Sequence, residues 1–213
     1  MFREGAIFSH VKSVLAIGAH PDDIEYGCGG TLLMMGKRVK KTAFVASVGS
    51  KGDPSSGPAR AQESRVALQE LGVASAHIRD HAGLGPESFE TVLSDLYTFI
   101  QDHGPDLILT LGSHDTHQEH RYTYDLTVAA ARRSRTSILN YSVLSNTLDF
   151  KPQVFVDIAQ VFEDKKRILK LHRSQMSKYY MGEEYIEIFH SHQYASLHGI
   201  RYCESFEVVR ALI

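Results

Sequence analysis

Short apolar runs alternate with stretches of helical periodicity, and this alternation restricts the fold more than any other feature of the sequence. The predicted strands are Val14–Ile17, Thr42–Val48, Asp106–Leu111, Ser137–Leu144 and Val154–Asp157. Predicted helices open at Gly27–Gly36 and then cover Arg60–Leu71, Glu87–His103 and the region from Glu119 to about Arg133. Such an order favours a mostly parallel sheet with helices on both faces. We therefore expect a three-layer, Rossmann-like α/β fold, with one domain over residues 1–213.

The composition is that of an ordinary globular protein, apart from 12 histidines. The formal net charge of −2 gives no reason to expect binding to nucleic acid or to an anionic membrane. No apolar run approaches the roughly 20 residues that span a bilayer, and Met1 to His10 lacks the apolar segment of a signal peptide. We therefore expect a cytoplasmic protein without a membrane span.

Two polar clusters follow two of the predicted strands. His20, Asp22 and Asp23 come directly after the first strand, and residues 114–120, which include His117 and His120, come after the third. In open parallel sheets, sites form at the carboxyl ends of the strands. The two clusters are therefore expected to form the two walls of one site.

These residue types are suited to a metal centre. His20, Asp23 and His120 provide two nitrogen ligands and one oxygen ligand, and catalytic zinc usually takes three protein ligands. Asp22 is then free to act as general base. If a helix begins near His117, then His117 and His120 share a face, so that one can bind the metal while the other stands over the reacting carbonyl. Glu119 could orient one of these two imidazoles.

Simpler interpretations exist for each cluster. The His-Pro-Asp-Asp segment could be a helix-capping turn with Asp22 or Asp23 as N-cap, and a His-x-x-His pair is often a solvated helix face. The presence of both clusters at strand ends favours the metal site. Cys28 and the glycines around it do not match a dinucleotide-binding motif and are expected to let a helix pack closely. Eight further histidines are interpreted as surface or packing residues: His10, His77, His81, His103, His172, His190, His192 and His198.

With these motifs assembled, the chain resembles the PIG-L/LmbE-like family of zinc-dependent N-deacetylases. The family's opening signature is matched by Ala19–Asp23, Glu25 and Gly29–Thr31, and its His-x-Asp-His signature by His117–His120. Glu119 replaces the Asp of that second signature, which keeps the charge on a longer side chain.

The resemblance implies one zinc ion per chain, held by His20, Asp23 and His120. It also implies Asp22 as general base, and His117 as the group that stabilises the oxyanion or protonates the leaving amine. Arg60 could reach the substrate rim, or it could pair with Glu63 or Glu119.

The implied reaction is hydrolysis of an N-acyl amide, expected to be the acetamido group of an amino sugar or sugar conjugate. A single-metal ester or other hydrolase, or a non-catalytic sugar-binding relative, are the alternatives. The Gly49–Pro58 loop and the segment from Gln175 to Tyr185 are candidate pocket rims, the latter because its tyrosines could stack on a sugar ring. The resemblance also favours a homo-oligomer.

Overall fold

The computed structural model describes residues 8–212, which form a seven-stranded sheet in the order β3-β2-β1-β4-β5-β7-β6. The strands are β1 (Ser13–Gly18), β2 (Lys40–Val45), β3 (Ser75–Ile78), β4 (Leu107–Thr110), β5 (Ser137–Tyr141), β6 (Val154–Asp157) and β7 (Cys203–Arg210). The first five strands pair in parallel, whereas β7 runs antiparallel to both of its neighbours. The predicted mostly parallel sheet is confirmed.

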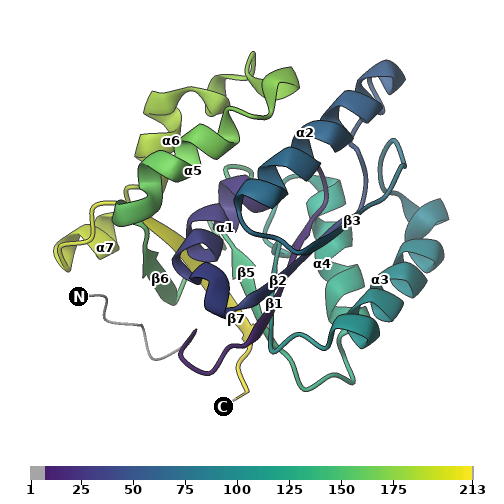
Figure 1. The fold of residues 1–213 in the computed structure, drawn as a ribbon, viewed down its shortest axis with the longest axis horizontal. Helices are drawn as coiled ribbons and strands as arrows, with labels where there is room; N and C mark the ends of the chain where they lie inside the picture. The colour runs from purple at the N-terminus through teal and green to yellow at the C-terminus, as the bar shows by residue number, and fades with distance from the viewer. Residues whose placement is uncertain (1–7, 213) are drawn as a thin grey trace.

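Helices cover both faces of this sheet (Figure 1). They are α1 (Asp23–Met34), α2 (Gly57–Glu70), α3 (Phe89–His103), α4 (Gln118–Ala130), α5 (Phe162–Leu169), α6 (Glu183–His190) and α7 (Gln193–Leu197). Helix α5 contacts both α1 and α2 on one side of the sheet, and α3 packs with α4 on the other (Figure 1). This is the expected three-layer α/β architecture. Among residues 8–212, no helix combines the length and apolar character needed to cross a bilayer.

Helix α1 approaches the sheet closely because glycines face it. A Cβ atom on Gly27 would lie 2.1 Å from the ring of Tyr141, and one on Gly30 would lie 2.8 Å from Ile158. The Tyr141 hydroxyl donates a hydrogen bond to the carbonyl of Ile17 at the end of β1, at 2.7 Å. The helix begins at Asp23, four residues before the predicted start, so the acidic pair lies at its N-terminus. Close packing of α1 thus fixes the turn that carries the first polar cluster.

Several predicted boundaries were wrong. The second and fourth predicted strands end early, at Val45 and Tyr141. The end of the Gly49–Pro58 loop is helical, because Pro54–Ser56 form a 3-10 turn and α2 begins at Gly57. Strands β3 and β7 were not predicted. For β3 the reason is physical: it is a short edge strand whose first three side chains are exposed, so it lacks an apolar run.

Candidate metal centre

The two polar clusters meet where the strand order reverses. β1 has β2 on one side and β4 on the other, so the chain leaves β1 and β4 at adjacent points of one sheet edge. The turn after β1 carries His20, Asp22 and Asp23, and the N-terminus of α4 carries His117 and His120. Ligand sites in doubly wound sheets form at this crevice. The two clusters line one pocket, as expected.

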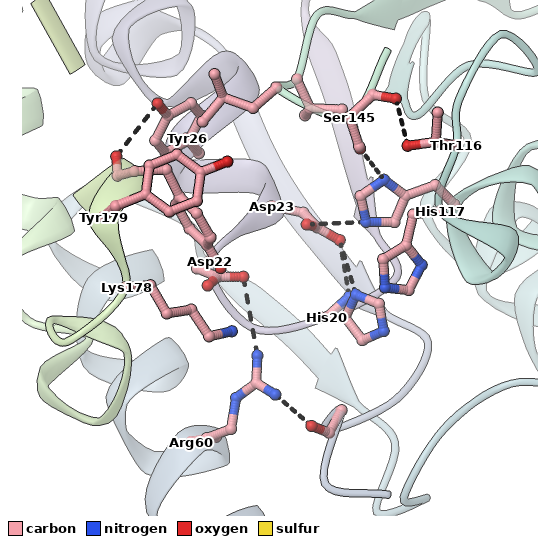
Figure 2. Close-up of a pocket in the computed structure, with 15 residues that line it drawn as sticks. His20, Asp22, Asp23, Tyr26, Arg60, Thr116, His117, Ser145, Lys178 and Tyr179 are labelled. Atoms are coloured by element: carbon pink, nitrogen blue, oxygen red, sulfur yellow. Dashed lines mark hydrogen bonds and ion pairs between the residues drawn. The ribbon is translucent and has the colours of Figure 1, made fainter. Parts of the chain in front are cut away.

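The turn after β1 separates the two aspartates. Asp23 Oδ2 accepts hydrogen bonds from the backbone N–H groups of Ala19 and His20, at 2.9 Å and 2.8 Å, which folds the chain back on itself. Asp22 has a φ of 106°, a left-handed conformation that a side-chain-bearing residue adopts at a cost in strain. Figure 2 shows the result: Asp22 faces Arg60, while Asp23 faces His20.

The helix-capping interpretation is correct about where Asp22 lies but not about what its side chain does. Asp22 is the N-cap residue of α1, yet its side chain makes no capping hydrogen bond to the described backbone. Both carboxylates are buried, with 8% of each residue exposed. Two buried carboxylates that do not cap the helix indicate a functional site.

Two histidines flank Asp23 in the same manner. His20 Nδ1 lies 3.6 Å from Asp23 Oδ2, and His120 Nε2 lies 3.4 Å from Asp23 Oδ1. The opposite nitrogen of each ring contacts another carboxylate: His20 Nε2 lies 3.0 Å from Glu119 Oε2, and His120 Nδ1 lies 2.8 Å from Asp115 Oδ2. Metal-binding histidines commonly hold a carboxylate in this way on the nitrogen that does not bind the metal. The donor set of two imidazole nitrogens and one carboxylate oxygen therefore fits a catalytic zinc ion.

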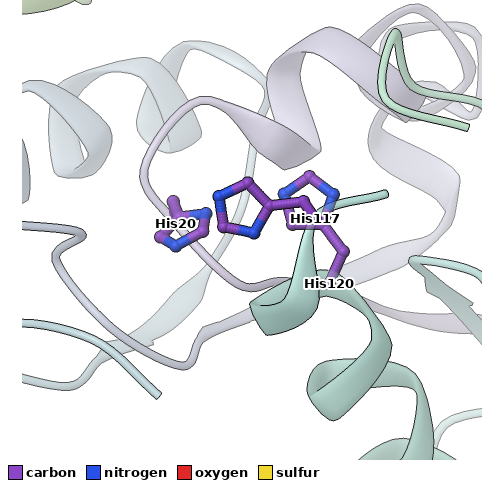
Figure 3. Close-up of side chains that lie close together, drawn as sticks. All are labelled: His20, His117 and His120. Carbon is purple, nitrogen blue, oxygen red and sulfur yellow. The ribbon is translucent and has the colours of Figure 1, made fainter. Parts of the chain in front are cut away.

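His117 completes a cluster of three imidazoles (Figure 3). Its ring stacks on His120 at 4.4 Å between centroids, and a nitrogen from each of His20, His117 and His120 lies within 4.8 Å of the other two. His117 Nδ1 accepts a hydrogen bond from the backbone N–H of Glu119, so the neutral ring carries its proton on Nε2. Burial and the neighbouring His120 and His20 lower the pKa of His117. These contacts favour a neutral His117 ring with a proton on Nε2, and the same three imidazoles are also a candidate metal cluster.

The surroundings of the two aspartates shift their pKa values in opposite directions. Burial raises the pKa of Asp22 to about 6, and the charge of Asp23 acts in the same direction. Burial also favours protonation of Asp23, but the charges and hydrogen bonds of His120 and His20 outweigh it and hold the pKa of Asp23 well below its usual value. Neighbouring carboxyls with separated pKa values are typical of a base beside a permanent anion.

Arg60 lies behind Asp22. Its Nη2 is 3.9 Å from Asp22 Oδ1 and donates to the carbonyl of Pro21 at 3.2 Å, while Nη1 donates to the carbonyl of Gly49. The pairing suggested for Arg60 with Glu63 or Glu119 was therefore wrong, because its carboxylate partner is Asp22. Arg60 also lines the pocket. Its contact with a substrate stays a prediction.

The carboxylates that hold the histidines differ from those predicted. Glu119 was expected to orient His117 or His120, but its carboxylate contacts His20. The carboxylate on His120 belongs to Asp115, which also accepts the backbone N–H of His117 at 2.7 Å. Asp115 was missed, although its place in the second cluster was a usable signal.

A further buried pair was missed behind the turn. His172 Nε2 lies 3.2 Å from Glu25 Oε1, and both side chains are almost fully buried. His172 was predicted to be a surface or packing residue; it is buried, and its acidic partner Glu25 was not predicted. His190, by contrast, is a buried packing residue that contacts the carbonyls of Ile186 and Tyr26, as predicted.

The cluster opens into a pocket of about 490 Å³, a size suited to a small molecule. The Gly49–Pro58 loop contributes Gly49 to its lining, and the second predicted rim contributes Lys178, Tyr179 and Tyr180 (Figure 2). The far wall includes the segment from Val143 to Ser145. Both predicted rims are thus part of the pocket.

The fold and the cluster together define a doubly wound α/β protein with a candidate single-metal centre at its switch point. Residues 15–131 match the family described as PIG-L: GlcNAc-PI de-N-acetylase. The chain belongs to this family, as its resemblance to the family's motifs predicted.

Relatives agree with that membership. An Escherichia coli (strain K12) protein named "Uncharacterized deacetylase YaiS" is 33% identical over 174 residues, which are 76% of this chain and 91% of the relative. Diacetylchitobiose deacetylase of Thermococcus kodakarensis is 27% identical over an alignment that covers 98% of this chain and 87% of the relative. The solved structure of N,N'-diacetylchitobiose deacetylase from Pyrococcus horikoshii has the same fold, with a TM-score of 0.81 and 24% identity; the match covers 95% of this chain and 85% of that one.

Proposed function

We propose that this protein is a zinc-dependent deacetylase that hydrolyses the acetamido group of an N-acetylated amino sugar or sugar conjugate. The observation that carries the proposal is the arrangement around Asp23, which lies between the inner nitrogens of two histidines while the separate carboxylate of Asp22 lines the same pocket. Relatives named as deacetylases support the choice of reaction.

His20, Asp23 and His120 would hold one zinc ion. Bound zinc polarises a carbonyl group and lowers the pKa of a water molecule, which is the chemistry that amide hydrolysis requires. The buried carboxylates of Glu119 and Asp115 would orient the two imidazoles toward the metal.

Asp22 acts as the general base in this proposal. Its raised pKa of about 6 means that the carboxylate can take a proton from water near neutral pH and later return it. The water oxygen adds to the carbonyl carbon as Asp22 takes the proton. The carbon–nitrogen bond then breaks as Asp22 delivers that proton to the departing nitrogen, which yields a free amine and acetic acid; the acid then releases its proton to solvent and leaves as acetate.

His117 stabilises the negative charge that develops on the carbonyl oxygen. Its Nδ1 is already occupied by the backbone N–H of Glu119, so Nε2–H is the donor that can reach a bound substrate. As the N-cap of α4, the residue is fixed at a helix terminus, so the donor is oriented before substrate binds.

The pocket rim suits a sugar. Tyr179 is 69% exposed and lines the pocket together with Tyr180, so their rings offer flat apolar surfaces to a pyranose. An ester could be cleaved by the same groups, and a non-catalytic sugar-binding protein would have no need of a buried base such as Asp22.

The test is release of free amine from a panel of N-acetylated sugars, including N-acetylglucosamine and N,N'-diacetylchitobiose, with matched O-acetyl esters alongside. The enzyme is assayed after chelator treatment and again after one equivalent of zinc is restored. The proposal predicts zinc-dependent amine release from at least one sugar amide. Zinc-dependent hydrolysis of the esters alone would establish an esterase instead.

A further inference from the structure

Glu119 lies at the centre of a partly buried network that connects two loops to the metal centre. Its Oε2 contacts His20 Nε2 at 3.0 Å and accepts the backbone N–H of Leu84 at 2.9 Å. Its Oε1 pairs with Lys51 Nζ at 2.9 Å, and Lys51 Nζ also donates to the Leu84 carbonyl at 2.8 Å. A single carboxylate thus joins the turn after β1, the segment before α3 and the loop before α2.

We propose that Lys51 and Glu119 form a positioning pair for His20, so that the loop after β2 helps to set the affinity of the site for its metal. The inference rests on the proposed zinc site but not on the identity of the substrate. It goes beyond the family resemblance, because the residue that departs from the family motif is the one that makes these contacts.

The longer side chain of Glu119 explains how the contacts arise. The residue lies in the first turn of α4 and is only 7% exposed, yet its carboxylate reaches across the site to the ring of His20 on the opposite wall. Removal of one methylene would draw the carboxylate back toward α4 and away from His20, Leu84 and Lys51. We therefore infer that the length of the Glu119 side chain is what allows its carboxylate to contact both walls of the site.

Lys51 holds this carboxylate in place. Lys51 Nζ and the backbone N–H of Leu84 each contact the Glu119 carboxylate at 2.9 Å. An anion that accepts a bond from His20 Nε2–H fixes the tautomer of the ring and leaves Nδ1, the nitrogen that faces Asp23, free to bind a metal.

Two neighbouring loops pack against the pair formed by Lys51 and Glu119. The backbone N–H groups of Val48 and Ser50 donate to the carbonyls of His81 and Ala82, at 2.8 Å and 2.7 Å, so the two loops run side by side. Gly83 then passes so close that a Cβ atom there would lie 2.3 Å from Lys51 Cε and 2.8 Å from Glu119 Oε1. Gly83 therefore packs directly against both members of the pair.

The experiment measures zinc affinity by competition with a chromogenic chelator, without substrate, for the full chain, four single variants and one double variant. Glu119→Gln keeps the shape but removes the charge, and we expect its dissociation constant for zinc to rise about 10- to 100-fold. Lys51→Met should also weaken zinc binding, by a smaller factor than Glu119→Gln. Lys51→Arg, which keeps the positive charge, should bind zinc with the affinity of the wild-type protein. Lys170→Met is the matched control, because Lys170 pairs with Glu183 at an exposed position that does not line the pocket.

The double variant Glu119→Gln/Lys51→Met should bind zinc no more weakly than Glu119→Gln alone, because the two residues act as one unit. Wild-type affinity in either Glu119→Gln or Lys51→Met overturns the proposal. If Glu119→Gln does not fold, Lys51→Met decides, since the Lys51 side chain is 52% exposed and can be changed without disturbing the core. A failure of the deacetylase proposal would appear separately, as zinc binding without amine release.

Discussion

Replacement of Glu204 by Gln tests the buried charge pair that holds α1 in place. Glu204, on β7, accepts the backbone N–H groups of Gly30 and Thr31 at 2.7 Å and 2.6 Å and pairs with the ammonium group of Lys165. The exposed fractions of the two side chains are 1% for Lys165 and 0% for Glu204. The substitution leaves the Lys165 charge buried without a counter-ion, and it turns an amide NH₂ group toward one of the two backbone donors.

Loss of one partner of a buried ion pair costs about 3–5 kcal/mol in the free energy of unfolding. Small globular proteins have only about 5–15 kcal/mol of stability in total, so this loss is a large fraction. For a chain of this size, each kcal/mol lowers the melting temperature by about 2–4 °C, which gives an expected decrease of roughly 6–20 °C.

The assay is urea unfolding followed by circular dichroism, with Glu204→Gln compared with Lys165→Met and with the double variant. The double variant should be less destabilised than the sum of the single variants, because it leaves no unpaired buried charge. A loss below about 1 kcal/mol for Glu204→Gln, or a double variant as unstable as the sum of the two, would refute the reasoning.

Three further predictions concern α1 and the metal centre. Gly27→Ala should destabilise the fold by about 1–3 kcal/mol, because the added methyl group would lie 2.1 Å from the Tyr141 ring. Thermal unfolding measures this loss, and an unchanged melting temperature would contradict the packing of α1 against Tyr141. Asp115→Asn should weaken zinc binding about 10- to 100-fold, because Asp115 holds His120 Nδ1 at 2.8 Å; chelator competition is the readout, and unaltered affinity would remove Asp115 from the site. Zinc removal by a chelator should abolish amine release and restored zinc should recover it, whereas activity that survives complete removal of the metal would exclude the proposed chemistry.

The sequence predicted what depends on local pattern. Helix α3 could be predicted because Val92, Leu96 and Ile100 repeat at helical spacing, and all three are buried. The meeting of the two polar clusters could be predicted because parallel strands direct their carboxyl ends to one edge. Both inferences require only the period of the chain and the geometry of a parallel sheet.

The rest depends on contacts between residues far apart in the chain. Glu119 contacts His20 across 99 positions, and Tyr141 reaches Ile17 across 124. The partner of Glu119 depends on how far α4 stands from the turn after β1, a distance that no local pattern contains. The same holds for Glu25 and His172, which only the packing of the chain after α5 against α1 brings together.

The most direct test of the account is a paired measurement on the variant Asp22→Asn. The account assigns Asp22 to proton transfer and His20, Asp23 and His120 to the metal, so zinc content should stay near one ion per chain while amine release from the N-acetylated sugar is abolished. Loss of zinc together with loss of activity would show that Asp22 belongs to the metal site. Retention of full activity would show that the base lies elsewhere.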